Sequence, residues 1–427
     1  MLTERIEFHP EADAEIFSTL ASAPAVFLLR GADANSEPYV SKTANLRRRL
    51  QRLLSAPEER TKRLNLRDRV RSIEYTLTGS DFESGLVLYQ TLRSVFPQTY
   101  ADRLRFRFAP LVKLHLENEF PRASITTRLG RLSGKNIYYG PFPSRTVAEK
   151  FMNDALDFFK MRRCVDDLHP DPTFPGCVYS EMKMCLAPCY KGCTDQRYAE
   201  ESNAVESFLA TRGESRLVTI RTQRDQASAN LEFESAASLH AQVQRVESIR
   251  ALAPELVRPL SQLRAVILQP SAHPDEVSLF IFENGRLNGP AAYSTLGMRI
   301  QNEASGSSSL FAQPMAIEPV PEMPPETTLP EASTDSAAPT PAKLPRSLLE
   351  SRLDAVLASL ALTTDPPSST CRQGHLALLK RWYYRPEARR SGEIFFPDAE
   401  GRWPSKSILR SIGRVAAGRL KATTPTP

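Results

Sequence analysis

The stretch "AVFLLRGADANSEPYVSKTANLRRRL", residues 25–50, decides the fold of the first part of the chain. It reads as an apolar strand, a loop rich in turn-forming residues, a second strand and then a strongly basic helix. A third strand is predicted at 72–79, "SIEYTLTG", and a second helix at 81–96, ended by Pro97. The pattern predicts the α/β class, with a small mixed sheet and flanking helices over residues 1–110.

Basic side chains cluster around the first helix. Between residues 40 and 72 there are eleven Lys and Arg against three acidic residues, in a chain of net charge +6. Such density suits contact with a phosphate backbone, although a solvated basic face without a partner remains an alternative. The candidate DNA-binding residues are Arg47, Arg48, Arg52, Lys62 and Arg63.

The composition divides the remaining chain into further segments. We expect a Cys-rich region at 111–200, a helical hairpin at 201–252 and a short β segment at 253–302. Residues 303–344 are rich in Pro, Ala, Ser and Thr, which predicts a flexible linker. A block with interleaved basic and aromatic residues at 345–427 is expected to fold as a small α+β unit.

No apolar run approaches the ~20 residues needed to cross a bilayer. The first residues also carry charges where a signal peptide would be apolar. We therefore expect a cytoplasmic protein without a membrane partner, in which structural disulfides are disfavoured.

Five of the six cysteines lie within thirty residues, at 164, 177, 185, 189 and 193. Several thiolates close together in a reducing compartment suit a soft metal centre, either zinc or an iron-sulfur cluster. The paired CxxC knuckles of zinc ribbons are missing, which favours iron-sulfur. A chance grouping of buried structural cysteines is the alternative.

The segment 217–250 predicts two short antiparallel helices. One helical stripe contains Leu217, Ile220, Ala227 and Leu231. The pattern breaks near 230–233, and Val243 and Val246 resume it. Such a hairpin can pack inside its own chain or pair with a hairpin of a partner.

The order of these features resembles one family, UvrC, the incision component of the bacterial excinuclease ABC system. That family combines a GIY-YIG nuclease domain, a "YFGPF"-like segment, a cysteine cluster and a UVR hairpin that binds UvrB. This chain has "YYGPF" at 138–142, "RRC" at 162–164, "CLAPC" at 185–189 and "NLEFESAASLHAQV" at 230–243.

The resemblance implies roles for individual residues. In the nuclease site, "YVSK" matches the family's "YVGK", so Tyr39 and Lys42 correspond to catalytic positions, as does Arg49. In the hairpin, the residues implied to contact a UvrB-like partner are Leu231, Phe233, Glu234, Ala236 and Ala237. A cluster of the 4Fe-4S type, with zinc as the alternative, would be held by Cys164, Cys177, Cys185 and Cys189.

Three departures from the family affect catalysis. Phe27 replaces the tyrosine of the first motif, Ser41 replaces a glycine, and Leu88 stands where a glutamate binds the metal. Leucine offers no oxygen to Mg²⁺, and Glu83, five residues earlier, projects from another face of the helix. We therefore expect a nucleotide excision repair protein that binds DNA and a UvrB-type partner and whose nuclease site is degenerate. The alternatives are an active Mg²⁺-dependent endonuclease and an assembly module that binds only protein.

Overall fold

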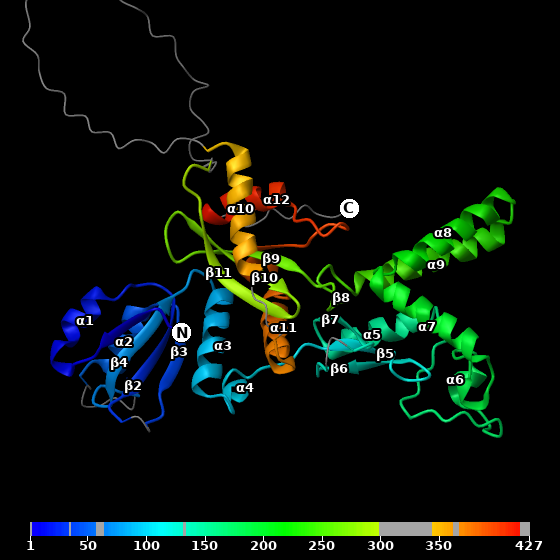
Figure 1. Ribbon diagram of the computed structural model, residues 1–427, viewed down its shortest axis with the longest axis horizontal. Helices are drawn as coiled ribbons and strands as arrows, with labels where there is room; N and C mark the ends of the chain where they lie inside the picture. Colours follow the sequence, from blue (N-terminus) through cyan, green and yellow to red (C-terminus); the bar gives the residue numbers. More distant parts are fainter. Residues whose placement is uncertain are drawn as a thin grey trace, which may run out of the picture.

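The computed structural model describes residues 2–33, 36–56, 64–130, 134–298, 344–361 and 367–418. Within them, three four-stranded sheets and their helices form an α/β protein, which confirms the predicted class (Figure 1). Lys62, Arg63 and, apart from residue 344, the predicted linker lie outside the described residues.

The first sheet has the strand order β1-β4-β2-β3, and all its pairings are antiparallel, so the expectation of a mixed sheet was wrong. Strands β2 and β3 are neighbours, and β4 lies between β1 and β2. The strands are β1 (Glu4–Glu7), β2 (Ala25–Gly31), β3 (Tyr39–Thr43) and β4 (Val70–Leu77).

Helices α1 (Asp13–Thr19) and α2 (Leu46–Leu54) share a buried core with this sheet. The basic helix expected from the sequence begins at Leu46 because the Asn45 side-chain oxygen accepts the Arg48 N–H at 2.9 Å. Its leucines face the core, which leaves the intervening arginines toward the surface.

Helix α3 (Asp81–Val95) and the short helix α4 (Tyr100–Arg103) follow β4 in the chain. Ser80 caps α3 by accepting the Glu83 N–H at 3.1 Å, and the helix ends before Pro97 as the sequence predicts. Its buried side chains Phe82, Leu86 and Tyr89 pack into a core that α3 shares with strands and a helix from the last part of the chain.

The second sheet has the order β6-β5-β7-β8. Its strands are β5 (Leu111–His115), β6 (Arg122–Thr126), β7 (Ile137–Gly140) and β8 (Arg258–Pro259). Helix α5 (Arg145–Leu156) packs on this sheet, where the buried Tyr139 ring of the "YYGPF" segment stacks on Phe151 at 5.4 Å.

The chain then passes through a cysteine-bearing loop into three helices. The loop contains α6 (Val178–Glu181), and α7 (Asp195–Ala210) leads to the hairpin of α8 (Glu214–Ala229) and α9 (Phe233–Ala251). The break predicted near 230–233 is confirmed. Figure 1 shows this hairpin extending away from the rest of the molecule.

The third sheet has the order β11-β10-β9-β12 and is covered on both faces. Its strands are β9 (Ala265–Pro270), β10 (Glu276–Glu283), β11 (Arg286–Ser294) and β12 (Glu393–Phe395). Along β10, Leu279 and Ile281 face a core with α10 (Arg346–Ala361) and α12 (Ser405–Ala416). The alternate residues Phe280 and Phe282 face α3 and α11 (Ser369–Tyr383).

Two glycines lie where the first unit, which is the first sheet with α1, α2 and α3, meets the third unit, which is the third sheet with α10, α11 and α12. A Cβ on Gly79 would lie 2.2 Å from the Pro270 carbonyl oxygen, and one on Gly374 would lie 2.5 Å from the Tyr89 hydroxyl. Both distances are far below normal contact, so this junction requires residues without side chains. It holds α3 directly against α11.

Among the described residues, no helix has both the length and the apolar character required to span a membrane.

Candidate functional site

Tyr39 and Arg49, two of the three predicted catalytic residues, are in contact. The Arg49 Nη2 donates a hydrogen bond to the Tyr39 hydroxyl at 3.0 Å, which joins β3 to α2. Phe27 lies beside Tyr39, with ring centroids 6.1 Å apart, and is completely buried. Position 27 thus presents an apolar ring within the core and no hydroxyl.

Lys42, the third predicted catalytic residue, faces a separate cavity and pairs with Asp81. The same carboxylate binds Arg385 at 2.5 Å. Burial acts to raise the pKa of Asp81, but the two cations outweigh burial and hold its pKa below the usual value. Lys42 is therefore engaged in a bridge between the first unit and the end of α11.

Leu88 lines the cavity that contains Lys42, and Tyr39 and Arg49 are not part of its wall. Glu83 is buried at the start of α3, where its Oε2 accepts the Gly79 N–H at 2.9 Å. Burial raises the pKa of Glu83. Among the described residues that line the cavity, Asp81 is the one carboxylate, and it is already paired with two cations.

The predicted DNA-binding arginines of α2 differ in what they contact. The Arg47 guanidinium donates to the carbonyl oxygens of Leu20 and Ser18 at 2.7 and 3.0 Å, which ties α2 to the end of α1. Arg48 and Arg52 are exposed and form no ion pair within the described part of the chain. These two side chains are available to a phosphate backbone.

Four cysteines of this region lie near enough for their thiols to influence one another's pKa. Burial raises the pKa of the Cys185 thiol to about 11, and the neighbouring thiols of Cys164, Cys189 and Cys177 act in the same direction. The fifth, Cys193, is influenced by Cys189 among the thiols. All of them are free and half-buried. The four thiols named from the sequence thus influence one another across a shared space.

Arg162, within the "RRC" motif, is a buried cation beside this group. It is 2% exposed, its Nη1 lies 3.5 Å from the Cys164 sulfur, and its other contacts include the carbonyl oxygens of Phe120 and Asp166. None of the hydrogen bonds from its guanidinium to the described residues is to a carboxylate. A buried cation is unfavourable without an opposite charge, so this surrounding favours an anionic group at the thiols.

The spacing of the thiols limits what they can hold. In the described ranges, no three His, Cys, Asp or Glu side chains come close enough to bind one metal ion. A single zinc ion needs sulfurs at ~2.3 Å from one centre. Within the described ranges, these side chains therefore do not form a preformed site for a single metal ion.

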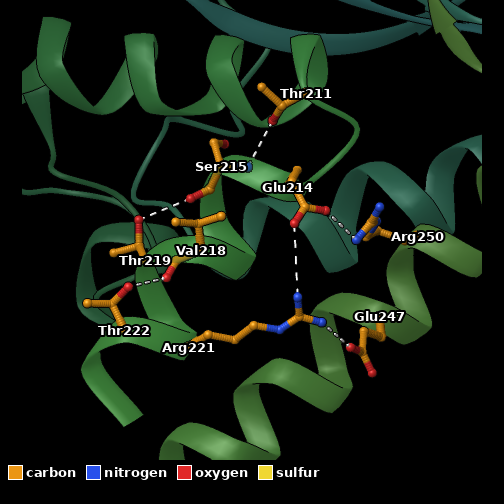
Figure 2. A network of polar contacts seen from close by, with 9 residues as sticks. All are labelled: Thr211, Glu214, Ser215, Val218, Thr219, Arg221, Thr222, Glu247 and Arg250. Carbon is orange, nitrogen blue, oxygen red and sulfur yellow. Dashed lines mark hydrogen bonds and ion pairs between the residues drawn. The ribbon is translucent and has the colours of Figure 1, made fainter. Parts of the chain in front are cut away.

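The base of the α8–α9 hairpin is fixed by ion pairs (Figure 2). Arg221 binds Glu247 at 2.8 Å, and Glu214 binds Arg250 at 2.9 Å, so each pair joins the two helices. Beneath them, Leu217 and Val246 are completely buried.

The hairpin tip has the opposite character. Leu231 and Phe233 are 70% and 68% exposed. Glu234 and Ala237 are also exposed and Ala236 is half-buried, so every residue named as partner-binding is accessible to some degree. The tip offers an apolar surface at the end of a rigid support.

Comparisons with known proteins bear on these features. Residues 110–208, which include the second sheet's first strands and the cysteine loop, match the family model "UvrC/Cho excinuclease, middle domain". The chain is 29% identical over 286 residues to UvrABC system protein C of Carboxydothermus hydrogenoformans. It is 32% identical over 233 residues to that of Pseudomonas paraeruginosa. Residues 110–208 therefore correspond to the middle domain of the UvrC excinucleases.

The chain spans less than half the length of the UvrC relatives it matches. The region matched to the Carboxydothermus protein covers 66% of this chain and 46% of that protein. The region matched to the Pseudomonas protein covers 54% of this chain and 38% of that protein. For UvrABC system protein C of Rickettsia bellii, 28% identical, the shares are 51% and 34%. No solved structure matches the chain.

Two features of this chain could not be found from the sequence alone. Arg162 was noted only as a motif letter, although "RRC" placed a cation two residues from a thiol. The cavity between α3 and α11 joins residues almost three hundred positions apart, for which no local pattern exists.

Proposed function

We propose that this chain acts in nucleotide excision repair as a DNA-binding protein that docks a UvrB-type partner and lacks nuclease activity. The observation that carries the loss of activity is Leu88: it replaces the metal-binding glutamate and lines a cavity whose one carboxylate, among described residues, is paired to Lys42 and Arg385.

Several steps of phosphodiester hydrolysis would be impaired. A hard cation such as Mg²⁺ requires oxygen ligands, which Leu88 does not supply. The Phe27 ring has no hydroxyl that could accept a proton from the attacking water. Lys42 is held in an ion pair with Asp81. What remains is the Tyr39–Arg49 pair, which can contact a phosphate.

The test is incubation of the purified chain with plain, nicked and damaged duplexes in Mg²⁺ or Mn²⁺. We expect DNA to be retarded in a gel at low salt and to remain intact. The retained Tyr39–Arg49 contact favours the second candidate function, an active endonuclease. Cleavage that disappears in Arg49→Ala would establish that function, and unchanged DNA mobility would favour a module that binds only protein.

We further propose that the four thiols hold an iron-sulfur cluster of the 4Fe-4S type, with Arg162 balancing its negative charge. The bound group would tie the loop at Cys164 to the loop at 177–189 and so stabilise this part of the fold. Support comes from the mutual influence of the thiols and from the buried guanidinium at 3.5 Å from a sulfur.

Protein purified without oxygen should be brown and contain about four iron and four sulfide per chain. Cys185→Ser should lose most of the iron, whereas Cys371→Ser, at a site on α11, should retain it. One equivalent of zinc per chain and no visible absorbance would contradict the iron-sulfur proposal and support the zinc alternative.

For the partner, we propose that the hairpin tip binds a UvrB-type hairpin through Leu231 and Phe233. These two apolar side chains are exposed, whereas the base of the hairpin is fixed by buried apolar side chains and by ion pairs between its helices. Exposed apolar side chains on a rigid support are typical of a surface that binds another protein. Leu231→Ser with Phe233→Ser should abolish co-migration with a UvrB-type protein in size-exclusion chromatography. Val218→Ser, at another exposed apolar position on α8, is the matched control and should leave co-migration intact.

A further inference from the structure

A cavity of about 420 Å³ lies where the first unit meets the third. Its walls come from α3, from the segment at 104–107 and from α11. This volume is within the range of sites that hold small molecules. Gly79 and Gly374 allow the two units to approach closely, and this close approach brings the walls of the cavity together.

The cavity wall is strongly cationic. Lys42 and Arg385 share the single carboxylate of Asp81, and no ion pair to a described residue forms at the other four cations of the wall. Those are Arg105, Arg107, Lys380 and Arg381. Burial lowers the pKa of Lys380, and the nearby Arg107 lowers it further. Two unpaired cations that repel each other in a cavity wall would be stabilised by a bound anion.

The inner surface of the same cavity is apolar and partly aromatic. It includes Leu88, Leu104, Phe106 and Trp382. The Trp382 ring is fixed because its Nε1 donates to the Ser391 carbonyl oxygen at 2.9 Å, and Phe106 packs against Tyr89 with centroids 5.6 Å apart. A flat ring could lie against this surface without rearrangement of the core.

We propose that this cavity binds a nucleoside phosphate, with the base against Phe106 and Leu88 and the phosphate between Arg107 and Lys380. An inorganic anion would leave the apolar surface unused, whereas a nucleoside phosphate carries an anionic group and a flat ring in one small molecule. A free mononucleotide and the phosphorylated end of a strand share this chemistry. The site is separate from Arg48 and Arg52 and does not depend on DNA binding by α2.

Leu88 has a second consequence in this arrangement. A glutamate at this position would place another carboxylate in the cavity, where it could pair with the cations and repel a phosphate. Leucine removes that charge and extends the apolar surface. The substitution that removes a metal ligand thus also gives the cavity its affinity for an anion with an apolar body.

The chain offers its own reporter for this binding. It contains two tryptophans, so Trp403→Phe leaves Trp382 in the cavity wall as the single emitter. Thymidine 5′-phosphate should change its fluorescence in a saturable manner, and calorimetry should give the same affinity. Thymidine and inorganic phosphate should each bind about tenfold more weakly or worse, because each makes half of the contacts.

Variants assign the response to the cavity. Lys380→Ala and Arg107→Ala should each weaken thymidine 5′-phosphate binding about tenfold, and Leu88→Phe should weaken it by filling space without changing charge. Lys150→Ala, an exposed lysine on α5, is the matched control and should have no effect. Thermal denaturation of every variant shows whether it is folded.

Two further comparisons complete the test. A short oligonucleotide with a 5′-phosphate that binds more tightly than the mononucleotide identifies a strand end as the source, whereas the reverse order identifies a free nucleotide. Arg48→Ala with Arg52→Ala should weaken duplex binding and leave thymidine 5′-phosphate binding unchanged. Inability of the folded protein to bind any nucleotide, equal affinity for inorganic phosphate, or insensitivity to all three cavity variants would overturn the proposal.

Discussion

Arg47 and Arg48 are consecutive in the sequence, and their side chains meet different surroundings. Arg47 points back to the end of α1 and satisfies two carbonyl oxygens that have no partner in that helix. Arg48 lies one step around α2 and faces solvent. Charge density in the sequence could identify the basic helix, but only the packing of α1 against α2 separates the structural arginine from the free one.

DNA binding should reveal this difference. Arg48→Ala with Arg52→Ala is expected to lower DNA affinity and to reduce the slope of log affinity against log salt by ~2, because each removes about one phosphate contact. Stability should change by less than ~0.5 kcal/mol. Arg47→Ala should instead lower the melting temperature. A salt slope equal to that of the unmodified protein would exclude Arg48 and Arg52 from the interface.

His375 is the buried residue that should make stability depend on pH. It is 5% exposed, its Nδ1 accepts the Leu287 N–H at 2.9 Å, and burial lowers its pKa to about 4, with Arg93 and Arg286 adding to the effect. Between pH ~6.5 and ~4, His375 therefore binds a proton in the unfolded chain but remains neutral in the folded chain.

The folded state should lose up to ~3 kcal/mol from this histidine as the pH falls from ~6.5 to ~4, with no further loss below that window. The half-buried His115, whose pKa is also lowered to about 4, acts in the same window. Urea denaturation at pH 7 and pH 5 should show a smaller difference for His375→Gln than for the unmodified protein. Equal differences would contradict the assignment.

At the scale of elements, the hairpin was predictable from the sequence and its burial was not. The spacing of Leu217, Ile220, Val243 and Val246 predicts two helices with one apolar seam, and the structure has them. Leu231 was placed on the same stripe, yet it lies in the turn with φ of 60° and is exposed. Periodicity cannot locate the point where a core ends, because the support from α5 and α7 comes from elsewhere in the chain.

The same substitution at the two ends of the hairpin should therefore have different effects. Leu217→Ala is expected to lower the free energy of unfolding by ~2–5 kcal/mol, since it leaves a cavity in a fully buried site. Leu231→Ala should change it by less than ~0.5 kcal/mol because the side chain is already in water. Chemical denaturation followed by circular dichroism measures both, and comparable losses would mean that the tip is packed.

At the scale of the whole molecule, α3 connects two units that the sequence presents separately. Its amphipathic pattern was read correctly as a helix of the first unit, but Phe82 and Tyr89 pack against β10 and α11. The strands at 265–294 likewise form one sheet with β12, and the helices after 344 pack on its two faces. Such partners lie up to three hundred residues apart, and no local pattern specifies which buried faces will meet.

Two helical glycines provide a test of this junction. A Cβ on Gly374 would lie 2.5–2.7 Å from the ring and hydroxyl of Tyr89, a buried side chain that cannot move aside freely, whereas a Cβ on Gly413 would meet nothing within 4 Å. Gly413→Ala should stabilise α12 by ~0.5–1 kcal/mol through helix propensity. Gly374→Ala gains the same propensity but should be destabilised overall by ~1–3 kcal/mol, because α11 must move away from α3. Melting temperatures should therefore shift in opposite directions, and the separation of α11 from α3 should also weaken nucleotide binding at their shared cavity; a rise in both melting temperatures would show that the two helices are not in tight contact.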